Sequence, residues 1–180
     1  MRLKAMAKIN LGLDVVRKRE DGYHEVRMIM QTIRMYDILD IRKTRRPGIV
    51  LTTNLPFIPT DQRNLVYKAA QMLMEEFDVE EGLSIKLRKF IPVAAGMAGG
   101  SSDAAAAFVG VNRMFHLGLT EEQLMERAVK VGADVPYCIM RGTALAEGIG
   151  EKLTRLPEVP KCYVLIGKPG INVSTKTAYE

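Results

Sequence analysis

The chain has 180 residues, enough for one domain with a substantial core and too few for two comfortable ones. Hydrophobic residues make up 47% and charged residues 26%, the balance of an ordinary soluble globular protein. The net charge of +5 favours an acidic partner, such as a nucleotide, a phosphorylated substrate or a nucleic acid. Trp is absent and aromatic residues are only 6%, so a base-stacking platform for nucleic acid is poorly supplied.

Cysteine and histidine are too sparse for a metal centre or a disulfide framework. Cys138 and Cys162 stand far apart in apolar contexts, so we expect two buried free thiols in a reducing compartment. With His24 and His116 as the only histidines, no zinc site is expected. The N-terminus lacks the apolar part of a signal peptide, and no apolar run approaches the ~20 residues of a membrane span. We therefore expect a cytoplasmic protein with no membrane partner.

The first third of the chain alternates apolar and polar residues as strands do. Strands are expected at 3–16, 28–33, 36–42 and 49–53. Asp21-Gly22 favours a turn after the first of them. The basic run at 42–48 is expected to be a solvated hairpin tip rather than a nucleic-acid patch, because no aromatic residues interleave with its charges.

The remaining segments alternate between helical and strand patterns. Apolar residues four apart predict a helix over 64–77, and Ser101 or Ser102 is expected to cap a helix that runs to 115. Thr120 and Gln123 form a capping box for a third helix, which stops at Gly132. Further strands are expected at 83–87, 142–147 and 162–167. The pattern indicates an α+β fold in which helices pack on a mixed sheet.

The segment 91–107 is the most informative part of the sequence, because a loop of small residues runs into four consecutive alanines. Its glycines let the backbone approach a ligand, and a helix N-terminus presents unpaired N–H groups and a positive dipole end. Together they predict a phosphate site. No Lys follows Gly99 or Gly100, so the segment is not a Walker loop. Ala94, Ala95 and Ala98 are expected to avoid positive φ.

The spacing Pro92-x-x-x-Gly96-x-x-Gly99-Gly100-Ser101-Ser102 resembles the phosphate loop of the GHMP kinases, which phosphorylate small-molecule hydroxyls with ATP. Three further segments match in order: Ala-Lys-Ile-Asn-Leu at 7–11, Asp-Gly-Tyr-His at 21–24 and Gly-Ala-Asp-Val-Pro at 132–136. The four segments together resemble those members of the family that act on a cytidine-diphosphate-linked methylerythritol in non-mevalonate isoprenoid synthesis. The resemblance implies that the 2-hydroxyl of this substrate is phosphorylated.

The same resemblance implies two catalytic residues, in which Lys8 stabilises the transferred charge and Asp134 takes the hydroxyl proton. From the residues alone, Lys8 could equally be an edge-strand lysine and Asp134 a turn aspartate. It also implies substrate-binding residues, namely Asn10, Tyr23, His24 and Thr175. The implied ATP-binding residues are Asn64, Lys89, Pro92, Val93, Ala94, Ala95, Gly96, Met97, Ala98, Gly99, Gly100, Ser101 and Ser102. Asp103 lies nearby and is expected to cap the helix.

ATP and magnesium are the cofactors that the resemblance implies, although no carboxylate pair indicates a metal site. It also implies an ATP-binding domain over 1–160 and the start of a second lobe over 161–180, so we expect this shortened chain to catalyse poorly. The alternatives are another GHMP kinase, acting on homoserine, mevalonate or a sugar, and a basic nucleic-acid module of ribosomal type. We expect a small-molecule partner and no nucleic acid, and the sequence does not give the oligomeric state.

Overall fold

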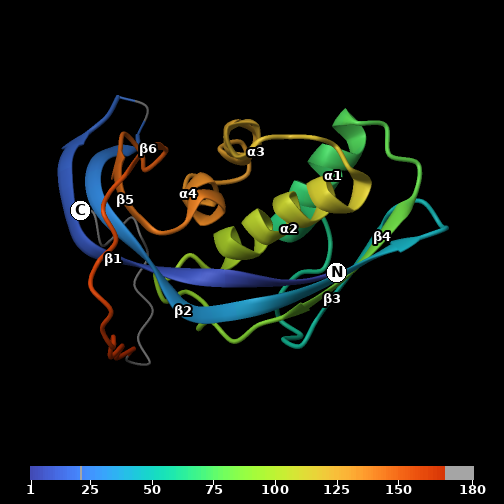
Figure 1. Ribbon diagram of the computed structural model, residues 1–180, viewed down its shortest axis with the longest axis horizontal. Coiled ribbons are helices and arrows are strands. Elements are labelled where there is room, and N and C mark those ends of the chain that lie inside the picture. Colours follow the sequence, from blue (N-terminus) through green and yellow to red (C-terminus); the bar gives the residue numbers. More distant parts are fainter. Residues whose placement is uncertain (21, 169–180) are drawn as a thin grey trace.

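A mixed six-stranded sheet carries all the helices on one face in the computed structural model, which describes residues 1–20 and 22–168 (Figure 1). The strands are β1 (Arg2–Lys18), β2 (His24–Thr44), β3 (Ile49–Thr53), β4 (Gly82–Arg88), β5 (Thr143–Glu147) and β6 (Lys152–Arg155). The helices are α1 (Leu65–Glu76), α2 (Gly99–Phe115), α3 (Glu121–Ala128) and α4 (Val135–Met140). The α+β fold with helices on a mixed sheet, expected from the sequence, is confirmed.

Strand β2 is the centre of the sheet because it pairs with three other strands. It lies antiparallel to β1 along most of its length, to β4 at residues 38–44 and to β5 at residues 28–31. The two strands expected at 28–33 and 36–42 are therefore one strand of 21 residues. The sequence pattern is interrupted between residues 33 and 36, but the strand continues there because β1 pairs with β2 on both sides of the interruption. Thr32 lies opposite Lys8, and Tyr36 lies opposite Met6.

Strand β3 lies parallel to β4 rather than beside β2, and α1 makes the connection between the two. The basic run after β2 is solvent-exposed at Arg45 and Arg46, as expected. It is not a hairpin tip, however, because β4 lies between β2 and β3. The pairing of β2 with β4, about 40 residues later in the sequence, determines this arrangement. The local pattern of apolar and polar residues gives no sign of such a distant pairing.

Helix α2 packs closely against its neighbours because small residues surround its first half. Ala104, Ala105, Ala106 and Ala107 are consecutive, so they point all round the helix, and all four are buried. Gly110 lies on the side that meets the sheet, since a Cβ there would lie 2.5 Å from Cδ1 of Ile41 and 2.7 Å from Cδ1 of Leu3. The absence of side-chain bulk lets the helix approach the sheet closely, and this approach places its N-terminus beside β1.

Most of the other helices and strands expected from the sequence are present in the structure, and a few differ. The strands at 3–16, 49–53, 83–87 and 142–147, the helix at 64–77 and the capping box of α3 are confirmed. Helix α4 and strand β6 were not expected. The strand expected at 162–167 is wrong, because residues 161–168 form neither helix nor strand and pair with no other strand. Cys138 is buried, whereas Cys162 is exposed, contrary to expectation. Among the described residues, no helix is long and apolar enough to cross a membrane.

Candidate active site

The loop between β4 and α2 folds into a concave backbone surface. We call residues 90–98 the phosphate loop. Its φ angles are positive at Ala94 (55°), Gly96 (69°) and Ala98 (52°), while the residues between them have negative φ. Alternating backbone handedness turns successive N–H groups toward one side and makes an anion-binding nest. The expectation that the alanines avoid positive φ is wrong for Ala94 and Ala98, and each carries a strain of about 1 kcal/mol.

Helix α2 begins at Gly99, three residues earlier than expected, and no side chain caps it. Its N-cap is Ala98, so neither Ser101 nor Ser102 fills the capping role that the sequence suggested. The hydroxyl of Ser102 instead donates to the backbone oxygen of Met6 on β1. The first N–H groups of this 17-residue helix lack an intrahelical partner, and they follow directly after the phosphate loop. The helix N-terminus therefore offers amides and a positive dipole end to an anion.

A cleft of about 370 Å³ lies alongside the phosphate loop and ends at α1. Asn64 lines it, but the Asn64 side chain already caps α1 by accepting from the Val66 amide (2.9 Å) and donating to the Pro59 oxygen (2.7 Å). Arg63 also lines the cleft and was not expected there. Its side chain is paired with Asp61 at 2.7 Å and is exposed. No spacing or motif in the sequence pointed to Arg63.

Lys8 and Asp134 lie close together although 126 positions separate them in the sequence. Lys8 is 5% exposed, and its Nζ lies 3.9 Å from Oδ2 of Asp134 and 3.1 Å from Oδ1 of Asn10. Asp134 precedes the first turn of α4, and its side chain makes no capping hydrogen bond there. The carboxylate is about one-third exposed, so it combines a cationic neighbour with access to solvent.

Tyr137 fixes α4 against the strand that pairs with Lys8. Its hydroxyl donates to the Gly142 oxygen at 2.7 Å and lies 3.1 Å from the hydroxyl oxygen of Thr32. Thr32 is the residue of β2 opposite Lys8. Asp134 lies in the turn before this short helix, which holds it near Lys8. Pro136 in the first turn of α4 suits a helix start.

The Lys8 and Asp134 pair adjoins the phosphate loop through the backbone. The amide of Lys8 donates to the oxygen of Met97 at 3.2 Å. Ala7, Ile91 and Met97 pack together in a small buried cluster beneath this contact. Buried Cys138 lies near the pair, and burial, followed by the charge of Asp134, raises the pKa of its thiol well above the usual range. The thiol therefore stays protonated and is a poor nucleophile.

The implied substrate residues are not all gathered at this point. Asn10 contacts Lys8 directly. Tyr23 is exposed beside the turn, and His24 is opposite Lys18 at the far end of the β1–β2 ribbon. Eight residues separate His24 from Thr32 on β2, a chain length of about 26 Å in extended strand. The curl of this ribbon in Figure 1 shortens the distance through space. Thr175 lies outside the described residues.

Lys89 lines the cleft, but its ammonium group is already engaged. Its Nζ contacts the carboxylates of Asp37 and, at 2.6 Å, Asp103. Asp103 therefore does not cap the helix but forms a buried ion pair. Among the described residues, no group of three His, Cys, Asp or Glu side chains could hold a metal ion.

The fold agrees with comparisons to known proteins. Residues 64–142 match the family described as the GHMP kinases N terminal domain. A crystal structure of 4-(cytidine 5'-diphospho)-2C-methyl-D-erythritol kinase is 35% identical with a TM-score of 0.76, covering 87% of this chain and 55% of that one. The mevalonate kinase structure from Methanococcus jannaschii has a TM-score of 0.68 at 15% identity, which shows the shared fold alone. The chain therefore has the fold of the GHMP kinase N-terminal domain, and residues 64–142 match the model of that domain.

Curated relatives narrow the comparison further. The protein of Lachnospira eligens named 4-diphosphocytidyl-2-C-methyl-D-erythritol kinase is 57% identical over 180 residues, which is 100% of this chain and 62% of the relative. The protein of the same name from Lachnoclostridium phytofermentans is 58% identical over 178 residues, 99% of this chain and 61% of the relative. The chain thus spans about three fifths of the length of these relatives.

Proposed function

We propose that the protein transfers the γ-phosphoryl group of ATP to the 2-hydroxyl of 4-diphosphocytidyl-2-C-methyl-D-erythritol. The observation that carries this proposal is the contact between the phosphate loop and Lys8, which brings an anion-binding nest next to the Lys8–Asp134 pair. The relatives named for this activity share at least half of their aligned residues with the chain over nearly its whole length. The free thiols of Cys138 and Cys162 support a location in the reducing cytoplasm.

The residues divide the work of phosphoryl transfer among themselves. The nest and the first amides of α2 bind phosphate oxygens, which suits them to ATP as the phosphoryl donor. Asp134 accepts the proton of the substrate hydroxyl at a carboxylate oxygen. Lys8, 3.9 Å away, holds that carboxylate in place and offsets the negative charge that develops on the transferred group. Asn10 in turn orients the Lys8 ammonium group.

Tyr23 and His24 are proposed to bind the cytidine end of the substrate, together with Thr175. Tyr23 and His24 lie at the end of the β1–β2 ribbon, away from Lys8, which suits a long substrate whose two ends are recognised separately. Magnesium is the second cofactor that the family implies. It would be held largely by the phosphate oxygens of the nucleotide and would offset their negative charge.

Other GHMP kinases remain the alternative within the class. The solved mevalonate and homoserine kinases resemble the chain at only 15% and 17% identity. The test is a phosphoryl-transfer assay with ATP and the cytidine substrate, with mevalonate and homoserine as competing acceptors. The enzyme of Lachnospira eligens serves as a positive control under the same conditions. Transfer to mevalonate or homoserine in preference to the cytidine substrate would refute the proposed specificity.

A further inference from the structure

Three charged side chains meet in the interior below the phosphate loop, and the proposed chemistry does not use them. Asp37 on β2 is 0% exposed, Lys89 after β4 is 8% exposed, and Asp103 on α2 is 2% exposed. The ammonium group of Lys89 lies between the two carboxylates. Oδ1 of Asp103 is buried without a hydrogen-bond partner. When all three groups are ionised, two negative charges face one positive charge, so the cluster carries a net charge of −1.

Each member of the cluster fastens a different part of the chain. The last pair at this end of the β2–β4 ladder is Ile38 and Arg88. Asp37 and Lys89 are the next residues along the two strands, just beyond that pair. Beyond this end, Oδ1 of Asp37 accepts from the amides of Phe90 (2.5 Å) and Ile91 (2.8 Å), the first residues of the phosphate loop. Asp37 thus takes over where backbone pairing stops and fixes the start of the loop.

The far end of the loop is fastened through Asp103, which lies in the first turns of α2. Lys89 connects this end to Asp37, and the side chain of Asn54 holds the Lys89 backbone on both sides, through its amide (2.8 Å) and its oxygen (3.1 Å). Gly99 is the point where the helix rests on Lys89, since a Cβ there would lie 3.1 Å from Nζ. The start of the loop, its end and the sheet are therefore joined through one ammonium group.

Stability alone does not account for such a cluster. A buried ion pair regains little more than the free energy it costs to desolvate, and an unpartnered carboxylate oxygen adds to that cost. Burial is the main cause that raises the pKa of Asp103 well above its usual range, so the interior disfavours the charged form of this carboxyl group. The loop above holds Ala94 and Ala98 in a strained conformation, which persists only where the surroundings over-determine it.

We propose that Asp37, Lys89 and Asp103 form a clamp that ties the two ends of the phosphate loop together and holds it in its anion-binding conformation. Lys89 and the two aspartates are positioning residues in this account, because they act on the nucleotide through the loop. The effect on ATP rests on the proposed kinase function, whereas the effect on the loop does not. A direct contact between Lys89 and nucleotide would predict the opposite response to loss of Asp103, because it would free the ammonium group.

The test compares Asp103→Ala with Asp103→Asn in the full chain. Both variants remove the same charge, but the Asn oxygen can still accept from Lys89, and the Ala side chain cannot. Ala also suits the helix interior, so α2 and the fold should persist. We expect Asp103→Ala to speed amide hydrogen exchange at Phe90, Ile91 and Ser102 by about tenfold, because a hydrogen bond to a charged group is lost.

Two controls distinguish local loosening of the phosphate loop from destabilisation of the whole protein: the Asp103→Asn variant, and the exchange rates of amides far from the loop. Asp103→Asn should stay within about threefold of the unmodified chain at the same amides, because its acceptor is retained. The amides of Leu83 and Leu124, which are bonded elsewhere, should keep their exchange rates in both variants, and the thermal midpoint of Asp103→Ala should not fall. Unchanged loop exchange in Asp103→Ala, or an equal acceleration at Leu83 and Leu124, would overturn the clamp.

The second measurement is the affinity of each variant for ATP, obtained by calorimetric titration. Asp103→Ala should weaken ATP binding by about tenfold and Asp103→Asn by no more than about threefold, because preorganisation of the loop is lost only in the first. Tighter binding by Asp103→Ala would overturn the clamp and support direct contact with Lys89. If the unmodified chain does not bind ATP, the proposed function fails, and the exchange measurements still decide whether the clamp exists.

Discussion

Ala98 stands at the junction of the phosphate loop and α2 in a left-handed conformation, with φ 52° and ψ 31°. Glycine adopts this conformation without strain and is also the better N-cap residue. We expect Ala98→Gly to raise the free energy of unfolding by up to about 1 kcal/mol, measured by urea denaturation. The same change at Ala105, inside α2, should lower it by about 1 kcal/mol or more. A loss of stability in Ala98→Gly would contradict the strain inferred from φ.

The proposed division of labour at the catalytic pair makes its own prediction. Asp134→Asn retains the shape of the side chain but removes its ability to take a proton. We expect turnover to fall by ~10²–10⁴-fold with little change in ATP affinity, the usual contribution of a general base. Steady-state kinetics in an active form of the enzyme, beside calorimetry with ATP, measures both quantities. A loss of less than threefold would remove Asp134 from the role of essential base.

The sequence predicted the site unevenly at this scale. The small-residue loop and the presence of a helix after it were apparent from composition, because few other purposes need so many glycines, alanines and serines together, but the residue at which the helix begins was not. The approach of Lys8 to Asp134 came only from family resemblance, since no local pattern links residues on β1 and α4. The burial of Lys89 between Asp37 and Asp103 was not predicted, because it depends on where the β2–β4 ladder stops. The positive φ angles of Ala94 and Ala98 were not predicted, because residues with a Cβ atom rarely adopt the left-handed backbone conformation.

At the scale of elements, the contact between α2 and the sheet sets how close the phosphate loop comes to β1. A Cβ at Gly110 would overlap Ile41, so we expect Gly110→Ala to destabilise the protein by about 1–3 kcal/mol through overpacking. Ile41→Val removes the nearer overlapping carbon and should recover part of this loss in the double variant. Gly12→Ala is the control, because its Cβ would meet no atom within 4 Å. Chemical denaturation of the unmodified chain, the two single variants at Gly110 and Ile41 and their double variant gives the coupling free energy between the two positions. Strictly additive effects would contradict a direct clash.

Elements with strong local signals were predicted and those defined by distant partners were not. Helices α1 and α3 have side-chain caps at Asn64 and Thr120, and β4 has strict alternation. In contrast, β6 is a strand only because β5 lies beside it. Residues 162–167 show the reverse case, since their continuous apolar run is suitable for a strand but no strand of the described residues pairs with them. Pairing partners decide such segments, and a sequence read locally does not contain them.

At the scale of the whole molecule, we propose that the compact unit ends near residue 160. Residues 156–168 follow β6 without helix or strand, and Tyr163 and Leu165 are fully exposed. We expect brief chymotrypsin treatment to cut first at these two residues and to leave a resistant fragment, identified by mass spectrometry. Buried Phe108 and Tyr137 serve as internal controls. Early cleavage within 1–155 would contradict this boundary.

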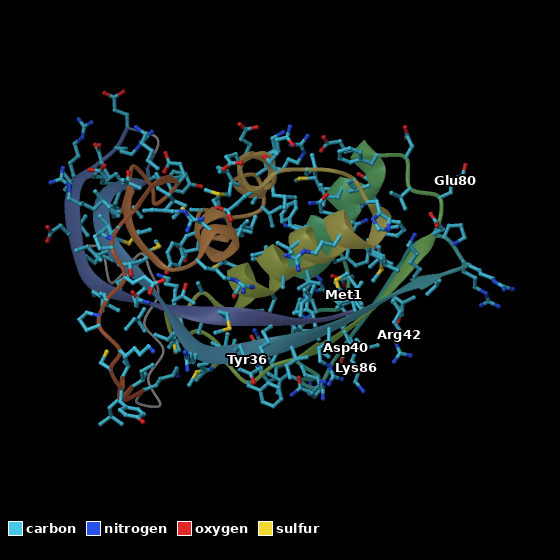
Figure 2. The ribbon with its side chains drawn as sticks, viewed as in Figure 1. Met1, Tyr36, Asp40, Arg42, Glu80 and Lys86 are labelled. Carbon is cyan, nitrogen blue, oxygen red and sulfur yellow. The ribbon has the colours of Figure 1, made fainter. Side chains whose placement is uncertain are left out.

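The open face of the sheet carries charged side chains away from the cleft. Asp40, Arg42 and Lys86 project on the side of the sheet opposite the helices (Figure 2). Asp40 joins this row by accepting from Arg2 at 2.7 Å and Arg88 at 3.0 Å, and the hydrogen bond from Arg2 is the main cause that lowers the pKa of Asp40. Charged side chains on this face keep it hydrated.

The pairing of β2 with three strands also sets the order in which a growing chain can complete its sheet. β1 can pair with β2 as soon as both have been made, but Thr143 of β5 follows Gln31 of β2 by 112 residues. At about 5–20 residues per second, roughly 6–22 s of synthesis separate the two. During that interval the edge of β2 at residues 28–31 lacks its final neighbour. Nascent chains should therefore be most vulnerable to wrong strand pairing before residue 147 has been added.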